Sequence, residues 1–207
     1  MLNIKKEKKI FSLLISEFHN ESLNDFSLNS ILKKKSINEE DFYYCFPNKT
    51  KSLCIFFLKN LQLKLENKTK KVIKSEKSIS KRVKFILIQL IMLLEEDKAT
   101  SLYFLNYMSR KLFFLKSISL NFSNTVWYLL DDKSVDFNFY TKRILLSKIL
   151  INSVLYWRGS NDHKKTEIFI NQQIDLLGKF GYYKSNFKAL ISKLTPKNFL
   201  TKFDFLH

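Results

Sequence analysis

The sequence VWYLLDDKSVDFNFYTKRILLSKILINSVLYW, residues 126–157, decides the fold class. Its apolar residues recur at helical spacing and predict a long helix over residues 135–158 that is apolar nearly all round. A helix with such a surface must be covered by other helices or by a partner. We therefore expect residues 126–157 to lie inside a helical bundle.

The same spacing recurs along the rest of the chain. It predicts further helices near residues 4–18, 28–34, 38–45, 48–67, 79–95, 98–113, 117–130, 162–180 and 184–194. No segment alternates as a strand does, and three Gly and two Pro leave few points at which a helix would break. The sequence therefore predicts an all-α protein.

Helix length divides the chain into three parts. The first three predicted helices are short and closely spaced, whereas the helices at 79–95 and 135–158 are long and apolar. We expect a small N-terminal unit over residues 1–48, a larger bundle over 49–182 and a C-terminal segment over 183–207. Residues 64–84 carry nine Lys or Arg against Glu66 and Glu76, and we interpret them as a solvated helix end and a linker.

The net charge points to an anionic partner. It is formally +17, with 36 Lys and Arg against 19 Asp and Glu, and such a charge attracts nucleic acid, lipid headgroups or an acidic protein. Four of these basic residues are Arg, the residue suited to fork-like phosphate recognition. A codon bias that raises Lys throughout the chain therefore stays open as the alternative.

Cysteine usage and hydropathy indicate a cytoplasmic location. Cys45 and Cys54 are spaced for neither a zinc site nor a disulfide framework. The N-terminal apolar stretch is interrupted at Glu17, too early for a secretory signal, and the apolar run over 85–94 is too short to span a membrane. We expect a protein that is soluble or peripheral on the inner membrane of a bacterial-type cell.

Residues 26–49, FSLNSILKKKSINEEDFYYCFPNK, resemble the helix-turn-helix of TetR-type regulators. In such a motif the third helix enters the major groove, but here it starts with Asn38, Glu39, Glu40 and Asp41, which would repel phosphates. A structural role accounts for them, with Ser36 or Asn38 as the helix cap and Glu39 completing a capping box. The residues that carry the resemblance are Ser27, Ile31, Ile37, Phe42, Tyr43, Phe46, Pro47 and Lys49.

We therefore expect no sequence-specific binding of nucleic acid by this unit. Lys33, Lys34 and Lys35 are the counter-argument, because they could grip phosphates without reading bases. A TetR-type transcriptional regulator with an apolar effector pocket remains the alternative function.

Residues 126–157 closely resemble the signature of the coenzyme Q protein nine family. The resemblance departs from the family pattern at Phe139 and Glu167, where Trp is usual, and Phe139 keeps an aromatic ring but loses the indole donor. The residues that match are Trp127, Asp132, Ser134, Asp136, Phe137, Asn138, Tyr140, Thr141, Lys142 and Arg143.

A polar stripe runs along the predicted helix 135–158. Asp136, Tyr140, Arg143 and Ser147 fall at i, i+4, i+7 and i+11, on one side of a helix that is otherwise apolar. Such a stripe must face solvent, a partner or its own paired charges. The alternative to a partner is that Asp136 caps the helix and Arg143 pairs locally.

The family resemblance implies a TetR-like bundle that binds an isoprenoid lipid or ubiquinone precursor and forms a homodimer. It implies an accessory protein of ubiquinone biosynthesis, not an enzyme, that presents a polyprenyl quinone intermediate at the membrane to a di-iron hydroxylase. The implied partner-binding residues are Asp136, Asn138, Phe139, Tyr140 and Arg143. The implied lipid-binding residues, for each of which core packing is the alternative, are Phe85, Leu90, Met92, Tyr103, Phe104, Met108, Trp127, Leu150 and Trp157.

Enzyme chemistry finds little support in the residues. The carboxylates Asp131, Asp132 and Asp136 are similar to the motif by which isoprenyl-diphosphate synthases hold magnesium, but Asp136 is rotated off the metal-facing side. His19, His163 and His207 lack neighbours at metal-ligand spacing. We expect no catalytic residues, no cofactor and no metal.

The C-terminal segment is a basic amphipathic pattern that ends at Pro196. A basic polar face opposite large apolar residues is typical of helices that bind at a membrane surface, and packing on the bundle or on a second subunit is the alternative. The predicted membrane-binding residues are Lys184, Phe187, Lys188, Leu190, Ile191, Lys193 and Leu194.

Overall fold

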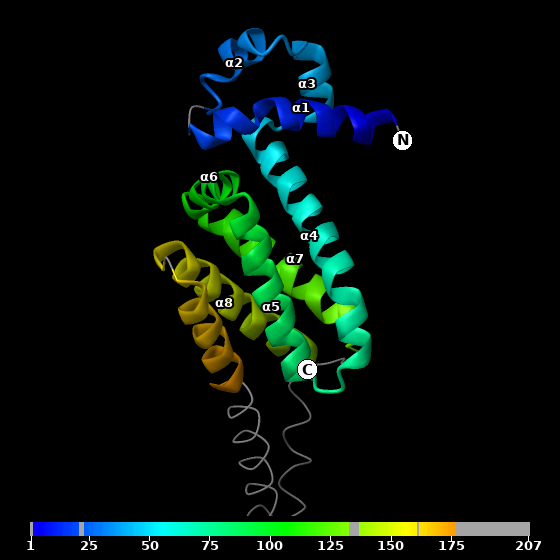
Figure 1. The fold of residues 1–207 in the computed structure, drawn as a ribbon. Coiled ribbons are helices and arrows are strands. Elements are labelled where there is room, and N and C mark those ends of the chain that lie inside the picture. Colours follow the sequence, from blue (N-terminus) through cyan, green and yellow to red (C-terminus); the bar gives the residue numbers. More distant parts are fainter. Residues whose placement is uncertain (1, 21–22, 133–136, 161, 177–207) are drawn as a thin grey trace, which may run out of the picture.

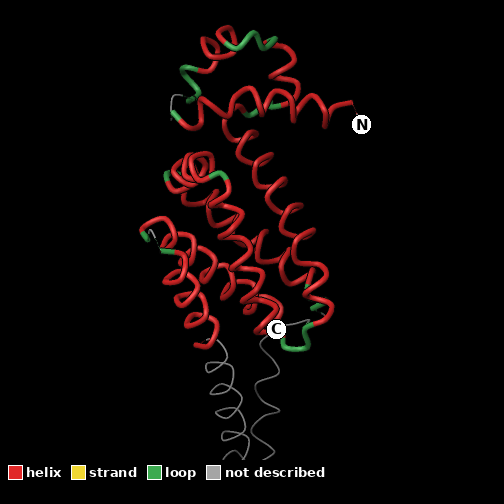
Figure 2. Tube along the Cα trace, in the orientation of Figure 1, coloured by secondary structure: helices red, strands yellow, loops and turns green. Residues whose placement is uncertain are grey.

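The computed structural model describes residues 2–20, 23–132, 137–160 and 162–176. Within these ranges the chain is helical and contains no strand, and short loops join the helices (Figures 1 and 2). The architecture is the predicted all-α, TetR-like one, in which a small helical unit sits at one end of a larger bundle. Its helices are α1 (Leu2–His19), α2 (Leu28–Lys34), α3 (Glu39–Cys45), α4 (Lys49–Ser75), α5 (Ile79–Glu96), α6 (Lys98–Ser109), α7 (Leu112–Leu129), α8 (Phe137–Gly159) and a helix over residues 163–176.

The N-terminal unit is formed by α1, α2 and α3, and an aromatic core joins it to the bundle. Phe18 of α1 is fully buried and its ring lies 5.1 Å from that of Tyr103 and 5.0 Å from that of Phe104, both on α6. The Tyr103 hydroxyl also donates to the Leu23 carbonyl at 2.6 Å. The unit and the first turns of α4 therefore share one core with α6, so the helix-turn-helix is not packed as a separate body.

Asn38, one of the two residues predicted to cap this helix, caps α3. Its side chain accepts a hydrogen bond from the Asp41 N–H at 3.1 Å, whereas Ser36 lies in the turn with a positive φ of 52°. With Asn38 at the cap, Glu39 is the first residue of the helix and not the third. The expected capping box through Glu39 is therefore wrong, because that motif needs its Glu three residues after the cap.

Helix α4 is longer than predicted. We expected it to end near residue 67, but it continues through the basic stretch to Ser75. The reason is a row of buried residues, Leu65, Thr69 and Ile73, spaced one helical turn apart among the lysines. The Thr69 hydroxyl, itself buried, donates to the Leu65 carbonyl at 2.8 Å, so the polar side chain is satisfied within the helix. The linker shrinks to the turn over residues 76–78.

The boundary between α6 and α7 also differs from the prediction. One helix was expected over 98–113 and the next from 117, but α6 ends at Ser109 and α7 starts at Leu112. No Gly or Pro marks this break. Lys111 stabilises the turn between the two helices. Its ammonium donates to the Tyr107 hydroxyl at 2.9 Å and lies 4.5 Å from the centroid of the Tyr107 ring.

The larger bundle is built around the long helices α4, α5, α7 and α8, with the helix over 163–176 beside them (Figure 1). Its core contains the apolar faces of α5 and α8, together with Phe122 and Val126 of α7. In the part of the chain that the structure describes, no helix is both long and apolar enough to cross a membrane.

Candidate functional site

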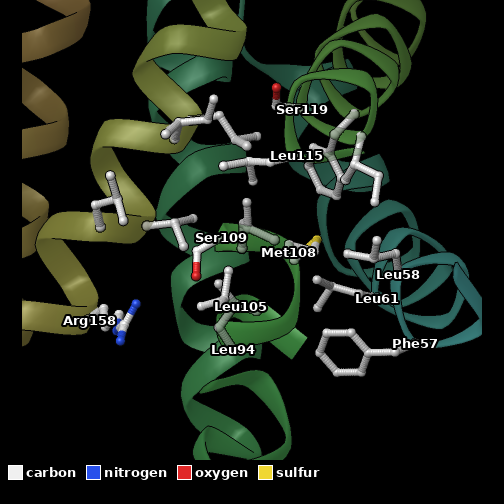
Figure 3. Close-up of a pocket in the computed structure, with 17 residues that line it drawn as sticks. Phe57, Leu58, Leu61, Leu94, Leu105, Met108, Ser109, Leu115, Ser119 and Arg158 are labelled. Carbon is white, nitrogen blue, oxygen red and sulfur yellow. The ribbon is translucent and has the colours of Figure 1, made fainter. Parts of the chain in front are cut away.

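An apolar cavity lies between α4, α5, α6, α7 and α8 (Figure 3). Its volume is about 80 Å³. Each of the five helices contributes apolar side chains because each turns one face toward the same axis of the bundle. The residues that line it are Phe57, Leu58, Leu61, Leu90, Leu94, Leu105, Met108, Ser109, Leu115, Ile118, Ser119, Phe122, Leu150, Ile151, Val154, Leu155 and Arg158.

The chemistry of this lining suits a hydrocarbon ligand. A cavity lined by Leu, Ile and Phe offers water too few polar partners, so such cavities stay dry and take up apolar ligands. Leaving a cavity of about 80 Å³ empty costs roughly 2 kcal/mol of stability, which a ligand that fills it would recover. Arg158 is the charged residue among the described residues that line the cavity, and its side chain is exposed to solvent.

Three of the predicted lipid-binding residues, Leu90, Met108 and Leu150, line this cavity. Tyr103 and Phe104 instead belong to the aromatic core beneath the N-terminal unit. Met92 is half exposed and faces a different groove, between α5 and the helix over 163–176. Phe85 is partly buried on α5 and is not among the lining residues.

The two tryptophans are held in the bundle core and do not line the cavity. Trp127 donates from Nε1 to the Lys142 carbonyl at 3.2 Å, and Trp157 donates from Nε1 to Glu95 Oε2 at 2.8 Å. Because an indole N–H inside a protein needs an acceptor, these bonds hold both rings in place. The sequence missed most of the cavity wall, since the periodicity of a helix does not show which neighbour each apolar side chain meets.

A second cluster of polar residues lies between α7 and α8, around Arg143. The Arg143 side chain is 6% exposed. Its Nε donates to Asn124 Oδ1 at 2.7 Å and its Nη1 lies 3.3 Å from Asp132 Oδ2. The guanidinium carbon is 3.4 Å from the centroid of the Phe139 ring, so the cation stacks on an aromatic face.

Asp132 is the shared acceptor of this cluster. Its carboxylate, 8% exposed, also pairs with Lys142 Nζ at 2.7 Å. Small residues let the two helices approach: Ser119 Oγ lies 3.1 Å from Ser147 Oγ, and Ser123 Oγ donates to the Arg143 carbonyl at 2.8 Å. This arrangement binds the end of α7 to the start of α8.

The predicted polar stripe therefore divides into an inner and an outer part. Arg143 and Ser147 point into the α7–α8 contact, which matches the alternative of local pairing. Tyr140 is 66% exposed and Phe139 is partly buried under Arg143. Asp136 and the side chain of Asn138 lie outside the described residues, as does the whole predicted membrane-binding segment from Lys184 to Leu194.

Helix α3 presents its acidic start to solvent. Glu40 is exposed, and Asp41 is partly exposed and pairs with Lys6 of α1 at 2.5 Å. Lys35, the C-cap residue of α2, is directed to the buried Glu17, with Nζ 3.0 Å from its carboxylate, and so compensates a charge inside the N-terminal unit. The cations available to grip phosphate are thus fewer than the three lysines in the sequence.

Cys45 and Cys54 are both buried thiols. Burial raises the pKa of the Cys54 thiol to about 12, and it also raises the pKa of Cys45. Both therefore stay protonated at neutral pH, where a thiol is a poor nucleophile and metal ligand.

Comparison with known proteins connects this region to one family. Residues 114–181 match the COQ9 family model. The probable ubiquinone biosynthesis protein coq9, mitochondrial, of Dictyostelium discoideum is 33% identical over 85 residues, which are 40% of this chain and 27% of the length of that protein. No solved structure matches. The family match includes the Arg143 cluster and the α7 and α8 walls of the cavity.

Proposed function

We propose that the chain, whose residues 114–181 match the COQ9 family model, is an accessory protein of ubiquinone biosynthesis that binds the isoprenoid tail of a quinone precursor in its apolar cavity. The observation that carries the proposal is the cavity itself, whose α7 and α8 walls fall within the matched residues. A polyprenyl chain is pure hydrocarbon, and transfer from water into such a lining is favourable in proportion to the apolar area removed from water.

The cavity is narrow, so the lipid enters by displacing side chains. Residues at its edge favour this route: Leu155 is 53% exposed and lies on α8 one turn before Arg158. An exposed apolar residue beside a cation suits a ligand with a hydrocarbon tail and a polar ring, because the tail can pass inward while the ring stays near charge. We propose that the ring remains at this edge.

The accessory role includes delivery to a di-iron hydroxylase of the same pathway. The exposed ring of Tyr140, at the start of α8, supports a docking surface there, since aromatic side chains with a polar tip are frequent at interface centres. The buried Arg143 supports that surface from below by fixing the α7–α8 junction. In this proposal the chain binds and presents the substrate and leaves the chemical step to the hydroxylase.

The test is mass spectrometry of lipid that co-purifies with the protein. Val154→Phe, at a buried position on the cavity wall, should remove co-purified polyprenyl lipid while the melting temperature stays equal or rises, because the ring fills the cavity. Ile144→Phe on the same helix, 59% exposed in the parent chain, is the matched control and should retain the lipid. Equal lipid in both folded variants would exclude the cavity as the binding site.

A further inference from the structure

A strongly basic surface lies at the end of the molecule opposite α1–α3, where α4 turns into α5 (Figure 1). We call residues 68–84 the hairpin tip. It contains eight Lys or Arg side chains and one Glu. The turn itself is well formed, because the Glu76 carboxylate accepts a hydrogen bond from the Ser78 N–H at 2.8 Å and the Ser78 hydroxyl caps α5.

The lysines of the hairpin tip fall into two groups. Lys68 pairs with Glu96, and Lys84 pairs with Asp175 at 2.7 Å, so these two charges hold helices together. The others are exposed and form no salt bridge within the part of the chain that the structure describes. They are Lys70, Lys71, Lys74, Lys77 and Lys81.

Exposed apolar side chains lie among these lysines. Val72 is 39% exposed and Ile79, the first residue of α5, is 50% exposed. Thr69 and Ile73 on the buried face of α4 are fixed in the core, so the helix cannot rotate to hide Val72. Lysines interspersed with branched apolar residues are the combination that binds at the interface of an anionic membrane. A helix surface that only faces water would not need the exposed apolar side chains of Val72 and Ile79.

The position of the hairpin tip adds a second argument. The pair of Lys84 with Asp175 places the end of the helix over 163–176 beside the start of α5. The described part of the chain therefore ends at the same end of the molecule as the tip (Figure 1). The segment 183–207, which its sequence predicts to bind a membrane, follows seven residues later in the chain.

We infer that the hairpin tip is a docking surface for an anionic lipid bilayer, separate from the cavity and from the C-terminal segment. Five uncommitted lysines supply the attraction to headgroups, each strengthening binding by about fivefold when it lies near the surface. Val72 and Ile79 supply apolar contact at the level of the headgroups. Nucleic acid fits less well, because the exposed cations of the tip are Lys where fork-like recognition uses Arg, and because binding would leave the two apolar side chains against phosphates.

The experiment is flotation of the full-length protein with vesicles of phosphatidylcholine alone or mixed with phosphatidylglycerol. In the tip variant, the five exposed lysines are changed to Gln. We expect its partition onto the mixed vesicles to fall at least about tenfold, with little change on neutral ones. The matched control removes the same charge elsewhere, by changing Lys5, Lys8, Lys9, Lys33 and Lys59 to Gln, and should change partition less than about threefold.

A second variant tests the apolar contribution. Val72→Ser with Ile79→Ser should weaken partition on both kinds of vesicle, because it removes apolar area and no charge. If the melting curve shows that the tip variant with five substitutions is poorly folded, the double variant Lys74→Gln with Lys77→Gln replaces it. Its partition onto mixed vesicles should fall by about tenfold.

Three results would overturn the inference: no vesicle binding by the parent protein, an equal loss in the control, or a tip variant that loses retention on duplex DNA while keeping its vesicle binding. Failure here is distinct from failure of the proposed function, since the tip variant should still co-purify with polyprenyl lipid.

Discussion

Arg143 and Tyr140 show that neighbouring residues of one helix can have different roles. Arg143 is buried against Asn124, Asp132 and Phe139, whereas Tyr140, one turn earlier, is two-thirds exposed. Removing one partner of a buried ion pair leaves an uncompensated charge in the core, but removing an exposed ring costs little folding energy. The two residues are therefore separable by experiment.

We predict that Tyr140→Ala changes the free energy of unfolding by less than about 0.5 kcal/mol and yet abolishes co-purification with the hydroxylase. Arg143→Met should instead destabilise the fold by about 3 kcal/mol, because Asp132 loses a buried partner. Denaturant unfolding measures the free energy of unfolding of both variants. Pull-down per folded molecule measures binding to the hydroxylase. A Tyr140 variant that unfolds, or that binds the hydroxylase normally, would contradict the docking role.

Glu95 should make stability depend on pH. Burial opposes its charge, but hydrogen bonds from Trp157 and Lys98 hold the pKa of Glu95 below its ordinary value of 4.5. A carboxylate with a lowered folded pKa adds stability above its unfolded pKa, and that contribution is lost as the pH falls through the folded value. The sensitive range is therefore the acid side of pH 4.5.

We predict that Glu95→Gln lowers stability at pH 7 by about 1 kcal/mol and that the difference from the parent protein shrinks at acid pH, below about 4. Glu167→Gln, at an exposed position on the same groove, is the control and should have no effect at either pH. Thermal melting across this range provides the measurement. A difference that grows on acidification would show that the sign is wrong.

Helix α4 shows how a buried row can hold a helix together through a highly charged stretch. Its last twelve residues, 64–75, carry five lysines, and mutual repulsion among them opposes helix formation. Packing prevails because Leu65, Thr69 and Ile73 are each buried against the bundle, and tertiary contacts supply most of the stability of helices in proteins.

We predict that Ile73→Ala destabilises the protein by about 2–4 kcal/mol, because it empties a buried site. The adjacent exposed Val72→Ala is the control, with an expected change of less than about 0.5 kcal/mol. Similar small effects at both positions in urea unfolding would mean that the end of α4 is not packed as described.

Across the whole molecule, the charge distribution argues against the regulator alternative. Two short helices, α2 and α3, occupy the predicted helix-turn-helix, but the start of α3 carries Glu39, Glu40 and Asp41 at the position that would enter the groove. Lys35 is paired with the buried Glu17. The unpaired lysines of the hairpin tip lie at the opposite end of the molecule.

We predict that duplex DNA binds weakly, without sequence preference and with a steep dependence on salt, because the attraction comes from diffuse lysine charge. Affinity selection from random duplexes at physiological salt is the measurement. Recovery of one sequence with a Kd of about 10 nM or tighter would favour the regulator over the accessory protein.

Local properties of the chain were enough for the all-α class, most helix positions and the two cap candidates Ser36 and Asn38, because periodicity, scarce glycine and capping chemistry act within a few residues. The residues of the central segment were likewise enough to indicate a resemblance to the family whose model matches residues 114–181. The helix boundaries that failed, at the end of α4 and between α6 and α7, are those without a local stop signal.

Only the tertiary structure decided which of the many apolar residues surround the cavity and which fill the core. Leu90 and Trp157 are both buried residues of apolar helices, yet the first lines the cavity and the second hydrogen-bonds Glu95. The same holds for Arg143, which faces inward because Asn124 of α7 and Asp132, just after α7, both contact it. Helical periodicity gives the face on which a side chain lies, but the neighbour that it meets depends on how distant helices cross.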